Sequence, residues 1–174
     1  MAIMELSYEQ KVWIDKNSFT SHDYLVVDAE CTDALRRRWL SKFLPGVDPL
    51  IHRCQTCSKE NLRSYYWHAF SFGLIESREI NRDVFERELK LLNGTIYLLW
   101  EQCNSPALKI EAGRLHQSTW HNADIYIFDA TYSWTFAVTH EGWIYYISGD
   151  KVSLKRCSAA PGSQVDIPEG SVEK

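Results

Sequence analysis

The sequence predicts an α+β fold in which three main helices pack on one face of an antiparallel sheet of about four to five strands. Three observations lead to this fold class. Apolar residues recur at helical spacing in three segments before residue 93. The run 95–100 is continuously apolar and of strand length. Short β-prone segments separated by turn residues then occupy 125–147.

The first half of the chain predicts one strand followed by three helices. The β-prone run 24–27 is expected to join an edge of the sheet. Helical spacing predicts an amphipathic helix over 32–44 and a second helix over 58–70. A third helix is expected over 81–92, because Gly94 supplies a left-handed stop directly after it.

The second half predicts most of the sheet. Strands are expected over 95–100, 125–128, 134–139 and 143–147. The last three form an antiparallel meander, and Gly142 provides the left-handed residue of a three-residue hairpin loop. A short helix is expected over 105–117, because Ser105 and Pro106 have the pattern of a helix start.

Length and charge limit the classes of protein. The chain has 174 residues and 20.3 kDa, which fits one globular domain over 1–157 with a flexible polar tail over 158–174. With 19 Lys and Arg against 23 Asp and Glu, the net charge of −4 argues against nucleic-acid binding and favours a basic partner. The run Arg36–Arg38 points in several directions around its helix, so these arginines are expected to be solvated.

Localisation and redox state follow from what the chain lacks. No stretch approaches the roughly 18 apolar residues that span a bilayer, and residues 1–8 contain the acidic Glu5 but no basic region of the kind that begins an export signal. We therefore expect a cytoplasmic protein that does not act at a membrane. The five cysteines are an odd number and mostly lie far apart, so we expect reduced thiols rather than a disulfide framework.

One cysteine pair has metal-ligand spacing. Cys54 and Cys57 form a CxxC motif, which is half of a zinc site. The sequence holds no second CxxC to complete it. We therefore expect no metal and no cofactor, with zinc at Cys54 and Cys57 as the weaker alternative.

A catalytic interpretation depends on the histidines. His140 lies next to Glu141 in the predicted hairpin loop, and His68 lies in the second predicted helix. These three residues, or the cysteines, could act as acid, base or metal ligands. The sequence has no nucleophile motif such as GxSxG, no HExxH and no Gly-rich phosphate loop. An enzyme is therefore the alternative interpretation.

The aromatic content favours a binding interpretation. Seven Trp, nine Tyr and seven Phe exceed what a core of this size requires, and Trp and Tyr dominate binding hot spots. We expect an outward aromatic patch with an acidic rim on the meander. The binding residues expected there are Tyr126, Asp129, Tyr132, Glu141 and Tyr145, with Tyr146 and Asp124 beside them.

Two blocks of the sequence carry a resemblance. Trp67-His68-Ala69-Phe70-Ser71 forms the first block, and the second runs from Asp124-Ile125-Tyr126 to Trp134-Thr135 and Thr139-His140-Glu141. These blocks resemble a small family of unknown function that is common in Bacillus-type bacteria, with Trp-His-x-Phe-Ser and Trp-Thr-x-x-x-Thr-His-Glu motifs. The resemblance spans about residues 32–146. It implies an intracellular bacterial α+β protein and brings no catalytic residues with it.

Two function classes follow. The first is a non-catalytic intracellular binding protein, most concretely an immunity-type protein of a toxin–antitoxin pair that neutralises a basic bacterial toxin. The second is a small enzyme that uses His140, Glu141 and His68 or the cysteines. A pocket lined by at least two of these side chains would favour the enzyme. A broad exposed face without a cleft would favour the binding protein.

Overall fold

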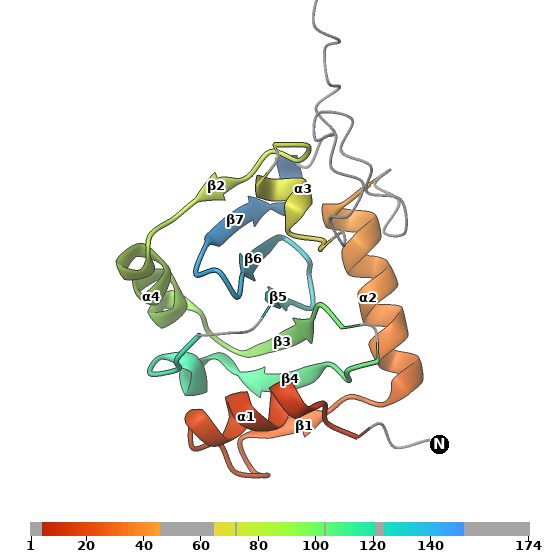
Figure 1. Cartoon of the computed structure of the whole chain (residues 1–174), viewed down its shortest axis with the longest axis vertical. Helices are drawn as coiled ribbons and strands as arrows, with labels where there is room; N and C mark the ends of the chain where they lie inside the picture. The colour runs from red at the N-terminus through yellow and green to blue at the C-terminus, as the bar shows by residue number, and fades with distance from the viewer. Residues whose placement is uncertain (1–4, 46–64, 72, 103, 121–123, 152–174) are drawn as a thin grey trace, which may run out of the picture.

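The computed structural model describes residues 5–45, 65–71, 73–102, 104–120 and 124–151, and all seven strands of this part join in one antiparallel sheet (Figure 1). The strands are β1 (Tyr24–Val26), β2 (Arg78–Glu79), β3 (Thr95–Trp100), β4 (Leu108–Glu111), β5 (Ile125–Asp129), β6 (Trp134–Val138) and β7 (Ile144–Ser148). Their order in the sheet is β1-β4-β3-β5-β6-β7-β2. The α+β class, the edge position of the 24–27 strand and the C-terminal meander are confirmed, with more strands than expected.

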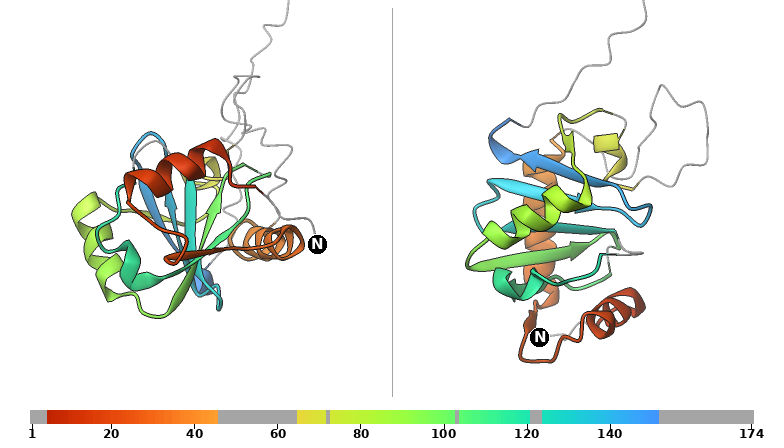
Figure 2. Two further views of the ribbon diagram at one scale, coloured as in Figure 1. Left: turned by 90° about the horizontal axis from the view of Figure 1, so that it is seen from below. Right: turned by 90° about the vertical axis from the view of Figure 1, so that its left-hand side faces the viewer.

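The helices lie on both faces of this sheet. They are α1 (Tyr8–Lys16), α2 (Ala29–Phe43), α3 (His68–Ser71) and α4 (Arg82–Leu91), with 3-10 turns η1 (Ala112–Leu115) and η2 (Gly149–Lys151). One core contains side chains of α1 and α4, and a second contains side chains of α2 and α3. Figure 2 shows α4 in front of the strands and α2 behind them. The expectation that the helices share one face is therefore wrong.

The strand sequences fit a sheet that is covered by helices on both faces. In β5, Ile125 and Ile127 face the core of α1 and α4, whereas Tyr126 and Phe128 face the core of α2 and α3. Successive side chains of a strand point to opposite faces, so burial on both sides requires apolar residues at consecutive positions. This explains why 95–100 and 125–128 are continuously apolar.

Local capping explains where the helices begin. The Asp28 side chain accepts a hydrogen bond from the Cys31 backbone N–H at 2.9 Å, so α2 starts before the expected residue 32. Asn81 caps α4 in the same way through the Val84 N–H, as the sequence predicted. Helix α1 was not predicted. Ser7 and Gln10 form a capping box at its start.

Two further segments differ from expectation. The segment 105–117 contains β4 and η1 instead of a short helix, because Leu108 and Ile110 alternate with polar residues and pair with β3. Of the helix expected over 58–70, only α3 falls in the described part, because 46–64 lies outside it. The predicted tail 158–174 also lies outside the described residues.

Candidate functional site

A largely buried carboxyl group marks the end of β3. Glu101 directly follows the buried Trp100, whose side chain faces the core of α1 and α4. The next residue of an extended chain points to the opposite face, so Glu101 turns toward α3. Its Oε1 accepts a hydrogen bond from the Tyr66 N–H at 2.9 Å, and its Oε2 accepts one from the Tyr126 hydroxyl. Glu101 thus links three segments: the end of β3, the start of β5 and the chain before α3.

Burial changes the acidity of this pair. Desolvation raises the pKa of Glu101 to about 7, against the opposing effect of the hydrogen bonds from Tyr126 and Tyr66. The carboxylate of Asp124 adds to the rise, and Arg36 opposes it. Burial, with the Glu101 charge second, holds the pKa of Tyr126 well above its usual value. Glu101 therefore exchanges its proton near neutral pH, while Tyr126 stays protonated.

Arg36 of α2 binds the backbone on either side of Glu101. Its guanidinium donates to the Trp100 carbonyl at 3.0 Å and to the Gln102 carbonyl at 2.9 Å, and the residue is 6% exposed. The expectation that all three consecutive arginines are solvated is wrong for Arg36. This side chain ties α2 to the end of β3, so its charge is held by backbone oxygens.

His140 and Asp124 form a pair at the same end of the sheet. The His140 Nδ1 lies 3.0 Å from both Asp124 carboxylate oxygens, and the His140 backbone N–H donates to Oδ1 at 3.0 Å. The carboxylate favours the tautomer with a proton on Nδ1, which leaves Nε2 as the second ring atom for chemistry or binding. Asp124, instead of the predicted neighbour Glu141, is the residue that orients His140. Glu141 itself is exposed.

Aromatic rings bring the two predicted histidines together. The Trp67 ring centroid lies 4.2 Å from that of His68 and 6.0 Å from that of His140. The Tyr65 ring lies 5.4 Å from His68 and 5.5 Å from His140. The two blocks of the resemblance, far apart in sequence, therefore meet here. We call this group the sheet-end cluster; it consists of Glu101, Tyr126, Asp124, His140, Tyr65, Trp67 and His68.

The predicted aromatic patch is not on the surface. Tyr126, Tyr132 and Tyr145 are 1%, 3% and 6% exposed, and all three belong to the core under α2 and α3. Burial raises the pKa of both Tyr132 and Tyr145. The expectation of an outward patch made by these residues is therefore wrong, because α2 and α3 cover the face on which they lie.

The two acidic residues predicted to form one rim, Asp129 and Glu141, lie far apart along the strands. Asp129 ends β5 beside the start of β6, whereas Glu141 follows the end of β6. The register pairs Ile125 with Val138 and Phe128 with Thr135. Asp129 and Glu141 therefore lie at opposite ends of these strands and do not form one rim.

An exposed tryptophan was missed by the sequence analysis, which placed it at the start of a strand. Trp143 is 46% exposed and follows the hairpin loop between β6 and β7. The Trp143 N–H donates to Thr139 Oγ1 and the Thr139 N–H donates to the Trp143 carbonyl, both at 3.0 Å. Gly142 has a φ of +90°, which confirms the left-handed position expected there. The loop backbone at Trp143 is thus held by hydrogen bonds, and its exposed side chain closely follows His140 and Glu141 in the sequence.

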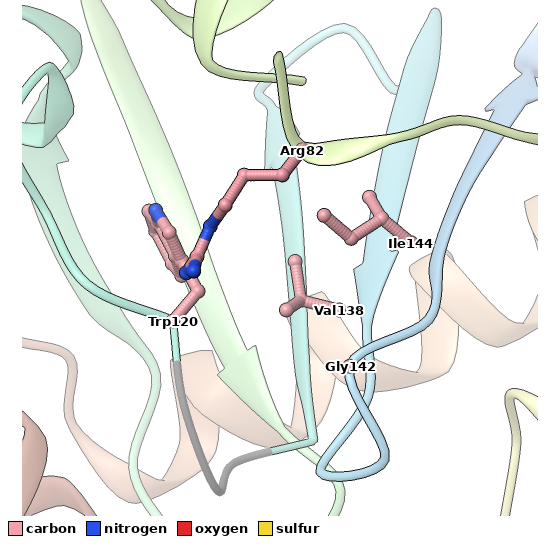
Figure 3. A pocket seen from close by; sticks show the side chains of 5 residues that line it. All are labelled: Arg82, Trp120, Val138, Gly142 and Ile144. Atoms are coloured by element: carbon pink, nitrogen blue, oxygen red, sulfur yellow. The ribbon is translucent and has the colours of Figure 1, made fainter. Parts of the chain in front are cut away.

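A pocket lies on the opposite face of the same hairpin (Figure 3). Its lining residues are Arg82, Trp120, Val138, Gly142 and Ile144. It contains neither predicted histidine, and no sequence motif pointed to it. The described residues contain no group of three or more His, Cys, Asp or Glu that could hold a metal ion. Cys54 and Cys57 lie outside the described residues.

Comparison with known proteins places the chain in a family. The model of a domain of unknown function, DUF4275, matches residues 29–147. The chain belongs to the DUF4275 family. The matched region of this DUF4275 protein runs from the start of α2 through β7 and so includes the sheet-end cluster and the hairpin. The match confirms a family of unknown function over nearly the span that the resemblance indicated.

No curated protein and no solved structure matches this DUF4275 chain. The family assignment therefore carries no activity, substrate or partner to the chain. Among the helices of the described segments, none combines the length and the apolar character that crossing a lipid bilayer requires.

Proposed function

We propose that this DUF4275 protein is a non-catalytic binding protein that captures a basic protein partner through the hairpin between β6 and β7. The observation that carries the proposal is the half-exposed Trp143 on a hydrogen-bonded loop. Tryptophan is enriched among the few residues that supply most of the binding free energy of protein interfaces. Burying this indole against a partner requires little ordering of the loop, so little of the binding free energy is lost to entropy.

The charges around the loop select the partner. Glu141 is exposed and lies two residues before Trp143 in the sequence. Asp124 contacts His140 at the same end of the sheet. With a net charge of −4, the protein attracts a basic partner during diffusional encounter. The pocket described above contains neither His140 nor His68, so it gives the enzyme interpretation no support.

The narrower form of the proposal names the biological setting. The resemblance noted in the sequence supports a bacterial, cytoplasmic protein with the Trp-His-x-Phe-Ser and Trp-Thr-x-x-x-Thr-His-Glu blocks. In that setting the basic partner is a toxin, and the protein acts as an immunity-type member of a toxin–antitoxin pair. Small acidic proteins suit this role because electrostatic attraction speeds capture.

Site-specific crosslinking tests the binding face. The photoreactive amino acid benzoylphenylalanine replaces Trp143 in protein expressed in the cells from which the chain comes. In a matched control the same amino acid replaces Leu91, which is 66% exposed at the end of α4. We expect one basic protein to crosslink at position 143 and not at position 91. Equal adducts at both positions, or an acidic adduct, would contradict the proposal.

A second function is favoured by one specific observation, the orientation of His140 by Asp124. This geometry leaves Nε2 as a general base or acid on a half-exposed ring, and Glu101 offers a second group that exchanges a proton near neutral pH. A panel of p-nitrophenyl carboxyl and phosphate esters tests it. Turnover that disappears in His140→Ala and persists in His22→Ala would establish the enzyme; equal rates in both variants would exclude this role of His140.

A further inference from the structure

The two edges of the sheet differ in the side chains that they present. One edge is β2, whose Arg78 and Glu79 are both charged and exposed. The other edge is β1, at the opposite end of the sheet in Figure 1, where Leu25 and Val26 are 64% and 40% exposed. Charged side chains on an edge strand discourage pairing with another chain, whereas an apolar edge favours it. The β1 edge is therefore the edge of the described sheet that suits a further strand.

Backbone pairing shows which groups of β1 face outward. The Val27 N–H donates to the Ala107 carbonyl at 2.9 Å, so these two residues form a hydrogen-bonded pair of the antiparallel β1–β4 ladder. Hydrogen-bonded pairs alternate with non-hydrogen-bonded pairs along such a ladder. Leu25 therefore also bonds to β4, through its register partner Lys109. The N–H and C=O groups of Tyr24 and Val26 point away from β4.

These outward groups match a second copy of the same strand. When two β1 strands run antiparallel with Leu25 on a two-fold axis, Tyr24 of each copy lies opposite Val26 of the other. Each such pair can exchange two hydrogen bonds, because the N–H and C=O groups of both residues already face outward. We propose that two copies of this protein associate through β1, so that their sheets join across a two-fold axis.

The side chains fit the same arrangement. The two Leu25 residues form a non-hydrogen-bonded pair, in which opposite side chains come closest, so their exposed apolar surface is buried between the copies. Strand β1 contains no charged residue, so no like charges meet across the axis within the strand. Strands β4, β3 and β5 lie between β1 and β6, so the interface is separate from the proposed partner-binding hairpin.

Sedimentation velocity of the full chain tests the association. Because the strand has three residues and buries little area, we expect a weak dimer with a dissociation constant of roughly 10–100 μM. Leu25→Lys places two like charges at the axis and should weaken the dimer at least about tenfold. Leu91→Lys makes the same change at a side chain that is 66% exposed on α4 and should leave the dimer unchanged.

Two results of this experiment would overturn the proposal. A wild type that stays monomeric up to about 500 μM would show that the β1 edge is not a self-association surface, whatever covers it instead. Equal effects of Leu25→Lys and Leu91→Lys would show that any dimer forms elsewhere.

Disulfide trapping tests the pairing itself, in a background in which the five native cysteines are replaced by Ser. In Leu25→Cys the two Cα atoms lie about 4.5 Å apart across the axis, within the range of a disulfide. In Val26→Cys the equivalent atoms are separated by two further residues and lie about 8 Å apart, beyond that range. We expect a covalent dimer to form readily in Leu25→Cys and slowly in Val26→Cys. Equal rates, or a faster reaction in Val26→Cys, would overturn the proposed pairing.

Discussion

Replacing Glu101 by Gln removes a carboxyl group whose pKa is raised to about 7 from the ordinary 4.5. Between these values the folded protein keeps a proton that the unfolded chain has lost, so the free energy of unfolding of the wild type falls as pH rises. Below pH 4.5 both states hold the proton, and above pH 7 both have lost it. The loss is therefore confined to that window.

The two pKa values fix the size of the effect. At about 1.4 kcal/mol per pH unit, Glu101 lowers the free energy of unfolding by about 2.5 kcal/mol between pH 5 and pH 8. Gln fits the same space: its oxygen can accept from the Tyr66 N–H, and its amide can donate to the Tyr126 hydroxyl. We therefore expect Glu101→Gln to gain about 2.5 kcal/mol relative to the wild type over this pH range.

Urea denaturation at pH 5, 6, 7 and 8 measures the difference. Other titrating groups contribute to the wild type and to Glu101→Gln alike, so they cancel when the two curves are subtracted. The exposed Glu76 gives the control: Glu76→Gln should follow the wild type at every pH. A difference between Glu101→Gln and the wild type that stays constant with pH would refute the account of the buried carboxyl group.

Three further predictions concern individual contacts. Arg36→Met leaves the buried Trp100 carbonyl and the Gln102 carbonyl without the guanidinium donor and should destabilise the fold by about 2–4 kcal/mol, whereas the exposed Arg37→Met should change stability little. Similar losses for the two variants in urea denaturation would contradict the buried role of Arg36. Asn81→Ala removes the side chain that accepts a hydrogen bond from the Val84 N–H at the start of α4, so the free energy of unfolding should fall by about 1 kcal/mol in the same assay. An unchanged free energy of unfolding would contradict the role of this cap. Elemental analysis of protein purified without chelator should find no zinc, and one equivalent that is lost in Cys54→Ala would reverse that prediction.

Local patterns predicted the elements whose boundaries depend on short-range chemistry. The strand 95–100 was predicted with its observed bounds, because a left-handed Gly94 separates it from α4. The three meander strands agree to within a residue at each end. Helix α1 was missed because few of its residues are buried, chiefly Trp13 and Ile14, which is too short a pattern to recognise.

The errors at the candidate site come from long-range packing. Arg36 bonds to the carbonyl of Trp100, a contact that no local pattern of three arginines reveals. The tyrosines were expected to be exposed because the aromatic content exceeded what one core requires, whereas they belong to a second core beneath α2 and α3. The pairing of His140 with Asp124 was accessible in principle, since an antiparallel β5–β6 hairpin brings residues just before β5 close to those just after β6.

The affinity of the purified protein for its crosslinked partner tests the binding account most directly. Isothermal titration calorimetry compares the wild type with Trp143→Ala, and stopped-flow kinetics compares Glu141→Lys with Asp129→Lys, which makes the same charge change at the opposite end of the strands. We predict that Trp143→Ala weakens binding at least about tenfold and that Glu141→Lys slows association more than Asp129→Lys. Unchanged affinity in Trp143→Ala, in a variant that remains folded, would contradict the central claim.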